Sequence, residues 1–364
     1  MRRVNLEFIE PGMKLAKSIY NSDGRVMLGK GVIINKYYLN RLVELGIQSV
    51  YVEDGLVELP PVPELVSEEI RARVLETLKS TFKAVKKENR LNLRLIQDTV
   101  DDLINELLDH KHFLYNLTDL KTHDDYTFQH SVNTCILSLM MGISFQYNQL
   151  KLKQLGIGAI LHDIGKTRID KDLLIKPGEL TSEEYKQIQR HTTYGYEILR
   201  EYEEISLLSA HVALQHHERW DGGGYPRNLK GNKIQEYALI VAVADIFDAL
   251  TSDRPYRKAF RNDQALGIMR TMAKTHFEAK SFLNLVANVA TYPVGTWVLL
   301  NTGNVAIVVE VRKENPVYPV IRLVFDKYGQ RLKGLREVDL TKLTSIRIIR
   351  SLSDKEIAKL LSSV

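Results

Sequence analysis

The sequence contains one cysteine, and none of its apolar stretches is long enough to cross a membrane. Cys135 has no partner for an intrachain disulfide, which favours a reducing compartment. The apolar stretches 134–145 and 238–250 are about a dozen residues long, whereas a membrane-spanning helix needs roughly 20. The start of the chain also has no apolar run after its basic residues, as a signal peptide would. These absences predict a soluble protein of the cytoplasm.

A strong charge of one sign is also missing. The 364 residues include 50 Lys and Arg against 45 Asp and Glu, and the resulting net charge of +5 is spread along the chain. Such a small excess gives no indication of nucleic-acid binding. The hydrophobic content of 44% is that of a globular protein and excludes a disordered or fibrous chain, and the length predicts two or three domains.

Four segments differ in their sequence pattern. Residues 1–58 mix short strand-like and helix-like stretches, which predicts a small α+β module. Residues 59–119 begin with closely spaced prolines, typical of a linker, and continue as a long helical segment without glycine. Helical periodicity dominates residues 120–291, and β-branched and aromatic runs separated by turn sequences dominate residues 292–364. We therefore predict a mainly α protein, with a helical core flanked by a small N-terminal α+β module and a small C-terminal β-rich module.

A heptad-like apolar stripe runs along the helical segment. Its members fall on alternating steps of three and four, with His110 filling one gap: Leu93, Ile96, Val100, Leu103, Leu107, Leu114 and Leu117. A stripe of this kind packs more often on its own domain than on a second chain. A homodimer through this segment is the alternative.

Seven of the ten histidines fall within 95 residues, between His123 and His217. One of them, His162, adjoins Asp163 where an apolar helix meets a glycine that can end it. A neutral imidazole and a carboxylate suit a divalent metal, and a carboxylate can bridge two ions. The His-Asp pair alone is weak evidence, since chance produces it in many proteins.

The second group of candidates lies in the run QHHERWDGGGYP, from Gln215 to Pro226. Adjacent side chains on a helix diverge by about 100°, so His216 and His217 are not expected to approach one metal from the same side. They could flank a site or serve different ions of a cluster. A surface junction between a helix and a loop is the alternative.

Asp245 is the third candidate, because the helix predicted over 237–250 is apolar nearly all round and is therefore expected to be buried. A buried carboxylate is strongly destabilising unless it meets a cation or hydrogen-bond donors. Binding a metal would supply the cation, and a hydrogen bond from a metal-ligating histidine would supply the donor.

Together with His130, these groups follow the order H…HD…H…HH…D, which resembles the HD superfamily of metal-dependent phosphohydrolases. The stretch HHE-x-x-x-G-x-G-Y-P narrows the resemblance to the HD-GYP branch, which hydrolyses the bacterial messenger cyclic di-GMP. The match covers roughly residues 120 to 290 and implies an all-helical bundle of the HD type. It also implies that the protein is a cyclic di-GMP phosphodiesterase of bacterial signalling.

The resemblance implies a ligand set, carried over residue by residue. Seven side chains would bind two ions bridged by Asp163: His130, His162, Asp163 and Asp245 at the first ion, and His191, His216 and His217 at the second. Some family members hold three metals and carry a glutamate one turn before the first histidine, where this chain has Tyr126. We therefore expect two divalent metal ions, with iron or manganese as the expected metals.

The same resemblance assigns residues to the substrate. The family places a lysine on a substrate phosphate at the position of Lys166, and the loop Gly224-Tyr225-Pro226 shapes the substrate side of the site. Arg254 and Arg257 share one face if their segment is helical, and they would then bind phosphate through paired hydrogen bonds. Surface ion pairs are the alternative for these two arginines.

The expected reaction is attack by a hydroxide that bridges the two ions. Ions about 3.5–4 Å apart polarise a phosphate oxygen, and in-line attack on phosphorus opens one phosphodiester of the ring, giving linear pGpG, GMP or both. Asp163 and Lys166 are the residues expected to act directly in this step. Glu218 and Asp221 would orient ligands or assist the leaving group, and for Glu218 a hydrogen bond to a histidine or lysine is favoured.

Three alternatives remain at this stage. A non-catalytic receptor would bind cyclic di-GMP or a partner protein and signal through the flanking modules. A related phosphohydrolase would act on another cyclic dinucleotide or a nucleotide monophosphate, and a di-iron centre would catalyse oxidation. Degenerate receptors usually lack ligands, whereas every matched ligand position is filled here, which favours catalysis.

Overall fold

The computed structural model describes residues 1–20, 26–53, 59–60, 65–111, 114–115, 126–176, 178–253 and 257–362. Some of the predicted features lie outside this description: prolines 61 and 63 of the linker, Leu117, Arg254 and the side chain of Tyr126. None of the helices in the described ranges combines the length and the apolar character that a membrane span needs.

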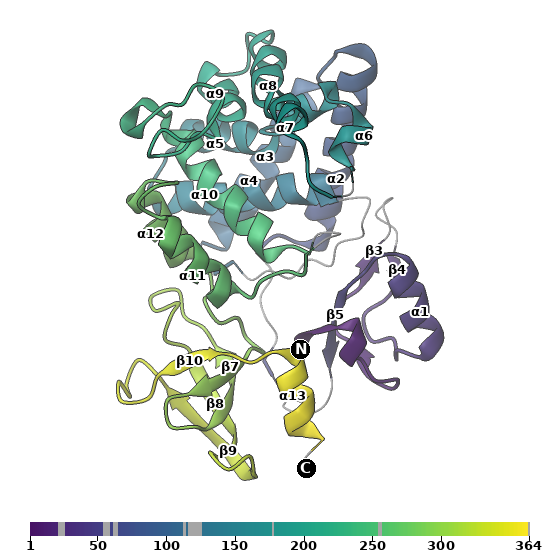
Figure 1. The fold of residues 1–364 in the computed structure, drawn as a ribbon, viewed down its shortest axis with the longest axis vertical. Helices are drawn as coiled ribbons and strands as arrows, with labels where there is room; N and C mark the ends of the chain where they lie inside the picture. Colours follow the sequence, from purple (N-terminus) through teal and green to yellow (C-terminus); the bar gives the residue numbers. More distant parts are fainter. Residues whose placement is uncertain are drawn as a thin grey trace.

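A bundle of helices forms the larger part of the molecule, shown as the upper body in Figure 1. Its helices are α2 (Glu68–Glu88), α3 (Leu93–Asp109), α4 (Tyr126–Ser144), α5 (Gln149–Ile160), α6 (Lys171–Leu174), α7 (Ser182–Gln189), α8 (His191–Arg200), α9 (Leu207–Gln215), α10 (Glu236–Thr251), α11 (Asn262–Met272) and α12 (Ala279–Asn288). One hydrophobic core draws buried side chains from α2 to α5 and from α8 to α12. The mainly α fold predicted from the periodicity is therefore confirmed.

The predicted long helical segment consists of two helices, α2 and α3. The chain turns at Asn89, whose φ of 50° ends α2 in the left-handed conformation. The stripe residues Ile96, Val100 and Leu107 of α3 are buried in the common core, against α4 and α5. The stripe thus packs on its own domain, the arrangement that is more common for such a pattern.

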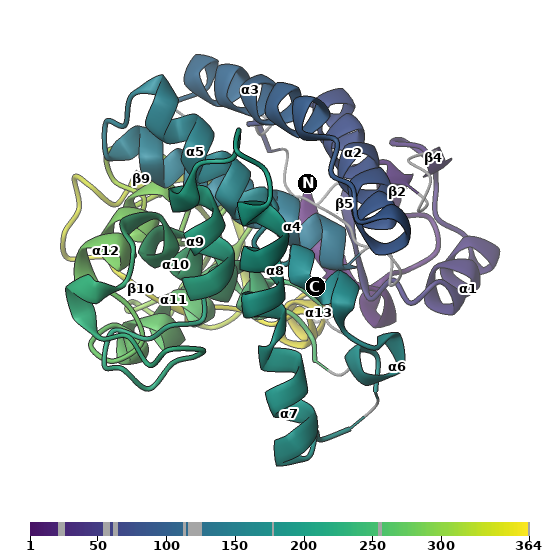
Figure 2. The ribbon, with the colours of Figure 1, turned by 90° about the horizontal axis from the view of Figure 1, so that it is seen from above.

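Two helices of the bundle centre, α4 and α10, position the site. Both are surrounded by other helices, which explains why they are apolar around nearly their whole circumference. The start of α10 is tied to the end of α9, because the backbone N–H of Gln235 donates to Gln215 Oε1 at 2.7 Å. Seen from above in Figure 2, α6 and α7 extend beyond the core helices beside α8.

The N-terminal part is a small α+β module, as predicted. Its antiparallel sheet has the order β1-β5-β2, formed by β1 (Arg2–Asn5), β5 (Ser49–Glu53) and β2 (Lys14–Leu15). The 3-10 helix η1 (Leu6–Phe8), the hairpin of β3 (Ile19–Tyr20) with β4 (Val26–Leu28) and the helix α1 (Lys36–Glu44) complete it. Val4, Leu42 and Val50 meet in a core separate from that of the bundle.

The C-terminal part is an antiparallel sheet of five strands in the order β10-β6-β7-β8-β9. The strands are β6 (Trp297–Leu300), β7 (Val305–Glu310), β8 (Val320–Phe325), β9 (Arg331–Asp339) and β10 (Ile348–Ser351). Alternate residues are buried on both faces, and Ile357 of the final helix α13 (Asp354–Leu361) joins Trp297 and Phe325 in the core on one of them. This is the predicted β-rich module.

Both small modules contact the segment that follows α10. Three residues after α10 form ion pairs with the modules: Asp253 with Arg3, Lys258 with Glu7 and Arg261 with Asp354. Asp253, two residues after α10, thus contacts the N-terminal module, and Arg261 at the start of α11 contacts the C-terminal helix α13.

Candidate metal centre

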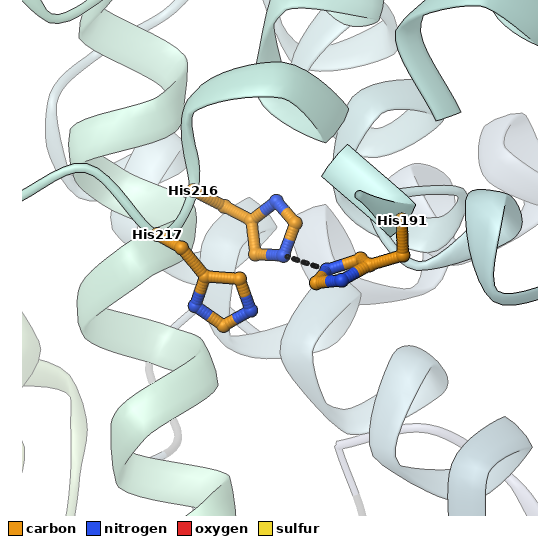
Figure 3. A group of neighbouring side chains, drawn as sticks. All are labelled: His191, His216 and His217. Carbon is orange, nitrogen blue, oxygen red and sulfur yellow. Dashed lines mark hydrogen bonds between the residues drawn. The ribbon is translucent and has the colours of Figure 1, made fainter. Parts of the chain in front are cut away.

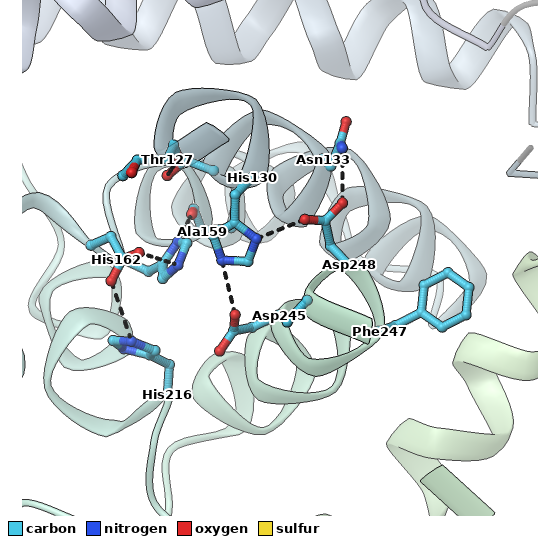
Figure 4. Close-up of polar contacts among 12 residues, drawn as sticks. Thr127, His130, Asn133, Ala159, His162, His216, Asp245, Phe247 and Asp248 are labelled. Atoms are coloured by element: carbon cyan, nitrogen blue, oxygen red, sulfur yellow. Dashed lines mark hydrogen bonds and ion pairs between the residues drawn. The ribbon is translucent and has the colours of Figure 1, made fainter. Parts of the chain in front are cut away.

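The first group of candidate ligands lies between α4 and α10. His130 of α4 points its Nε2 atom at Asp245 Oδ1 of α10, 2.9 Å away, and His162 lies beside them (Figure 4). One ligand atom from each of the three residues lies within 4.8 Å of the others, and all three side chains are buried. Ligands that share one ion are about 3–4.4 Å apart, given metal–ligand distances of 2.0–2.2 Å. The three side chains therefore surround a position that suits an ion.

Asp248 holds the other side of His130. Its Oδ2 lies 2.7 Å from His130 Nδ1, its Oδ1 accepts a hydrogen bond of 2.8 Å from Asn133, and Asn133 accepts one of 3.2 Å from Arg71 of α2. Burial lowers the pKa of His130, but the hydrogen bonds and charges of Asp245 and Asp248 outweigh burial and raise it to about 9. A carboxylate in the position of Asp248 orients a ligating imidazole and strengthens it as a ligand.

Asp248, Asn133 and Arg71 are not among the residues predicted from the sequence. Asp248 lies three residues after Asp245 and Asn133 three residues after His130, so each occupies the same face of its helix as the ligand. This spacing, with a second carboxylate in an apolar helix, was a signal that could have found Asp248. No such signal exists for Arg71, which belongs to another helix.

His162 and Asp163 lie where α5 ends and the short 3-10 helix η3 (Ile164–Arg168) begins. His162 Nδ1 donates to the carbonyl of Ala159 at 2.8 Å, which leaves its Nε2 facing Asp163 Oδ2 at 3.4 Å. Gly165 allows η3 to approach α8 closely, since a Cβ atom there would lie 1.9 Å from the carbonyl oxygen of His191. The glycine therefore brings Asp163 next to the second group of ligands.

The second group consists of His191 at the start of α8 and of His216 and His217 at the end of α9 (Figure 3). The Nε2 atoms of His191 and His216 are 3.4 Å apart, and one ligand atom from each of the three lies within 4.8 Å of the others. The expected divergence of the two adjacent histidines is wrong. His216 caps α9 and His217 follows it, so helical geometry no longer separates their rings, whose centroids are 4.1 Å apart.

Burial lowers the pKa values of the histidines in the second group, which favours their neutral form. Nδ1 of His191 donates to the carbonyl of Ile188 at 2.7 Å, and Nδ1 of His216 donates to that of Ala213 at 3.0 Å. Both Nε2 lone pairs are thereby left for a ligand. Burial lowers the pKa of His191 to about 3 and that of His217 to about 4. A neutral imidazole is the form that binds a metal.

Asp163 lies between the two groups and is almost completely buried. Its Oδ1 is 3.5 Å from His191 Nε2 and 3.9 Å from His216 Nε2, and it accepts no hydrogen bond from any described residue. Burial raises the pKa of Asp163, but Lys166 and His162 outweigh burial and hold it well below its usual range. An ionised, buried oxygen without a donor fits a position between cations. The donor set of this centre therefore fits divalent metal ions.

The two acidic residues of the loop after His217 bind the loop itself. Glu218 accepts hydrogen bonds from the backbone N–H groups of Arg227 (2.7 Å) and Leu229 (2.8 Å). The expected bond from Glu218 to a histidine or lysine is therefore not the one observed. Asp221 pairs with Arg219 at 2.6 Å. Both carboxylates fix the shape of the loop.

The loop carries Tyr225 over the second group. Gly224 packs directly on the backbone of the segment that follows α9, where a Cβ atom would lie 2.3 Å from the backbone nitrogen of Arg219. The ring centroid of Tyr225 is 4.8 Å from that of His217, and Pro226 follows it at the rim of the cavity. The segment predicted to shape the substrate side thus borders the candidate ligands.

The predicted cationic residues lie in different places. Lys166 Nζ is 2.6 Å from Asp163 Oδ2, and its side chain is partly exposed. Arg257 donates from Nη2 to the carbonyl of Ala249 at 2.5 Å, at the end of α10, and its guanidinium lies over the ring of Phe260. Arg257 thus binds the helix terminus and is not part of the cavity lining, while Arg254 lies outside the described residues.

A cavity of about 740 Å³ opens beside the second group. Its lining includes His216, His217, Tyr225 and Ile246 of α10, together with residues of α7. Sites for small molecules typically have volumes of about 300–1,000 Å³. A ligand of the size of a nucleotide can therefore reach the half-buried His217, while His216 lies buried behind the cavity lining.

Comparisons with known proteins agree with this geometry. Residues 102–280 match the HD domain, and residues 297–360 match the KOW domain associated with HD domains. The chain is 34% identical over 273 residues to a cyclic di-GMP phosphodiesterase of Pseudomonas aeruginosa. The aligned residues make up 73% of this chain and 65% of that protein.

Another curated protein and a solved structure are also similar to this chain. The chain is 36% identical over 160 residues to the 3'3'-cGAMP-specific phosphodiesterase 3 of Vibrio cholerae. The aligned residues make up 44% of this chain and 35% of that protein. The solved structure of an HDG"Y"P protein from Bdellovibrio bacteriovorus, 15% identical, aligns with a TM-score of 0.48 over 78% of this chain and 97% of that one.

The chain spans less than two thirds of the length of either curated relative. The matched HD domain nevertheless contains every candidate ligand named above, from His130 to Asp245. Residues 102–280 thus match the HD domain, and the residues 297–360 that follow match the KOW domain associated with it.

Proposed function

We propose that this protein is a metal-dependent phosphodiesterase that hydrolyses cyclic di-GMP. The observation that carries the proposal is the convergence of five imidazoles, of which four are buried and that of His217 is half-buried, with two buried carboxylates beside a cavity of about 740 Å³. The similarity to a cyclic di-GMP phosphodiesterase over 73% of the chain supports the substrate. Cys135 is a buried free thiol, which is consistent with a reducing cytoplasm.

Two divalent ions would occupy the centre. The first would be held by His130, His162 and Asp245, the second by His191, His216 and His217, with Asp163 between them. A mixed set of imidazole and carboxylate donors supports iron or manganese. When bound, such ions act as Lewis acids toward a phosphate oxygen and lower the pKa of a water molecule.

The residues of the chain bind and orient the substrate. The partly exposed ammonium group of Lys166 is placed to donate to a phosphate oxygen and to stabilise the charge that develops there. The ring of Tyr225, beside His217, offers an apolar face to a guanine base. Opening one phosphodiester gives pGpG, and a second cleavage gives GMP.

A second candidate substrate is 3'3'-cGAMP, because the chain also resembles a phosphodiesterase specific for it. Both substrates are cyclic dinucleotides with two phosphodiesters, so the same centre suits either. A receptor without catalysis is less well supported, since the Nε2 atoms of His162, His191 and His216 are already directed at the metal position. A homodimer through α3 lacks support, because its apolar stripe is buried within the chain.

Product chromatography on anaerobically metal-loaded protein tests the proposal. Incubation with cyclic di-GMP should yield pGpG or GMP, and 3'3'-cGAMP and AMP serve as competing substrates. Binding of cyclic di-GMP without turnover would favour the receptor. Turnover of AMP but of neither cyclic dinucleotide would overturn the substrate assignment.

A further inference from the structure

The α7 side of the cavity is positively charged. Lys186 of α7, Arg190 between α7 and α8, and Arg219 after α9 all contribute to its lining. Within the described residues, Glu218 is the one carboxylate of that lining, and both of its oxygens accept hydrogen bonds from backbone N–H groups. Backbone N–H groups thus orient Glu218, and the three cations outnumber the one carboxylate in this lining.

The donors of these cations are also available. Lys186 and Arg190 form no ion pair with any residue in the described part of the chain, and the guanidinium of Arg190 lies over the ring of Tyr194 at 5.2 Å. Arg219 pairs with Asp221 through Nη2, but its Nε is buried and has no acceptor among the described residues. A buried donor without an acceptor is destabilising, and an anionic oxygen of a ligand would satisfy it.

We propose that Lys186, Arg190 and Arg219 form a subsite for the second phosphate of a cyclic dinucleotide. The inference rests on the proposed function and names the residues that recognise its substrate. A cyclic dinucleotide carries two phosphodiester anions, and the ligand cluster accounts for the one that is cleaved. The other needs cations at a distance from the cluster, and this wall of the same cavity supplies them.

Two aromatic side chains border the same subsite. The ring centroids of Tyr185 and Tyr225 are 6.3 Å apart in an edge-to-face arrangement, and both residues line the cavity. Aromatic faces accept the bases of nucleotides, while the guanidinium groups bind phosphate. The combination selects a ligand with a base and a second phosphate over a simple phosphodiester.

Substitution of Arg190 tests the subsite in the full, metal-loaded chain. The experiment measures KM and kcat for cyclic di-GMP, the Kd of a slowly hydrolysed phosphorothioate analogue of cyclic di-GMP, and the metal content. For Arg190→Ala we expect KM and Kd to rise about ten- to hundredfold, because hydrogen bonds to a charged group are lost. The metal content should stay that of the wild type. The KM and Kd of Arg190→Lys should lie between those of the wild type and those of Arg190→Ala, because lysine keeps the charge but lacks the paired donors of arginine.

Arg200→Ala is the matched control. Arg200 lies at the other end of α8 and contacts the ring of Tyr196 at 5.8 Å, as Arg190 contacts that of Tyr194, but it is not part of the cavity lining. This variant should keep the wild-type KM and Kd.

The outcomes separate the subsite from the proposed function. If the wild type hydrolyses cyclic di-GMP but Arg190→Ala and Lys186→Ala keep its KM and Kd, the subsite is wrong and the phosphodiesterase function stands. If the wild type binds the analogue without hydrolysing cyclic di-GMP, and Arg190→Ala still weakens binding tenfold, the subsite stands and the function fails. Absence of binding to the wild type would overturn both.

Discussion

The two groups of candidate ligands in this HD domain are oriented by different means. His130 is held by side chains from three helices, through Asp245, Asp248, Asn133 and Arg71. His191 and His216 are instead held by carbonyl groups of the turns that precede them. The first group therefore depends on packing across the bundle, whereas the second depends on local backbone geometry.

The same difference appears in the charge of the two groups. Neighbouring carboxylates raise the pKa of His130 to about 9, whereas burial lowers the pKa values of His191 and His217 to about 3 and about 4. Near neutral pH the first group holds a proton that a metal must displace, and the second group does not. The two halves of one centre should thus respond differently to pH and to mutation.

Asp163→Ala should have the largest effect, because this carboxylate contacts both groups. We expect loss of both ions and a fall in turnover of about a thousandfold or more, since metal ions contribute several kcal/mol of transition-state stabilisation. Elemental analysis and product chromatography on the same sample measure both. Two ions retained at full activity would contradict the position of Asp163 between the groups.

Gly165→Ala should damage the contact that joins the two groups. The new Cβ atom would lie 1.9 Å from the carbonyl oxygen of His191, so η3 and α8 must move apart, at a cost of at least about 1–3 kcal/mol. Thermal unfolding of the metal-free variant measures this loss. The matched control is Gly267→Ala in α11, where a Cβ atom meets nothing within 4 Å, and a gain of about 0.5–1 kcal/mol is expected. Equal stabilities of the two variants would show that the close approach is not required.

The pH dependence of metal binding separates the groups directly. Below a pKa of about 9 a proton competes with the ion at His130, so the affinity of the first group should rise about tenfold per pH unit between pH 6 and 8. Histidines with pKa values of about 3 and about 4 are already neutral in this range, so the affinity of the second group should stay constant. Metal titrations by calorimetry at several pH values measure both. Two sites with the same pH dependence would contradict the distinction.

Asp248→Asn and Arg71→Gln should have the smallest effects, and only on the first group. Loss of the Asp248 carboxylate should weaken metal binding about ten- to hundredfold, as for other residues that hold a ligating histidine.

Arg71→Gln acts through Asn133, so we expect the metal affinity of the first group to fall less than about tenfold. The affinity of the second group is the internal control, and a loss there in either variant would show that the two groups are not independent.

The sequence predicts which histidine and aspartate side chains could lie together, because the types and the order of these residues are typical of the ligands of a metal centre. The periodicity also predicts the helical core and the two small modules, and the resemblance to the HD family implies that the helices form a bundle. The division between α2 and α3 could not be predicted, because Asn89 ends α2 in a left-handed conformation without the usual glycine or proline.

The details of the centre depend on tertiary structure. His216 and His217 converge because α9 ends at that point, which the helical pattern alone does not show. Arg71 reaches Asn133 from a helix 62 positions earlier in the sequence, and Arg190 joins the cavity through the placement of α7. Contacts of this kind follow from packing and leave no local pattern in the sequence.

The most direct test of the account is a crystal structure of the metal-loaded protein with anomalous scattering data at the edge of the bound metal. We predict two ions about 3.5–4 Å apart on either side of the Asp163 carboxylate, one next to His130 and Asp245 and the other next to His191 and His217. A single ion, or ions bound away from Asp163, would contradict it.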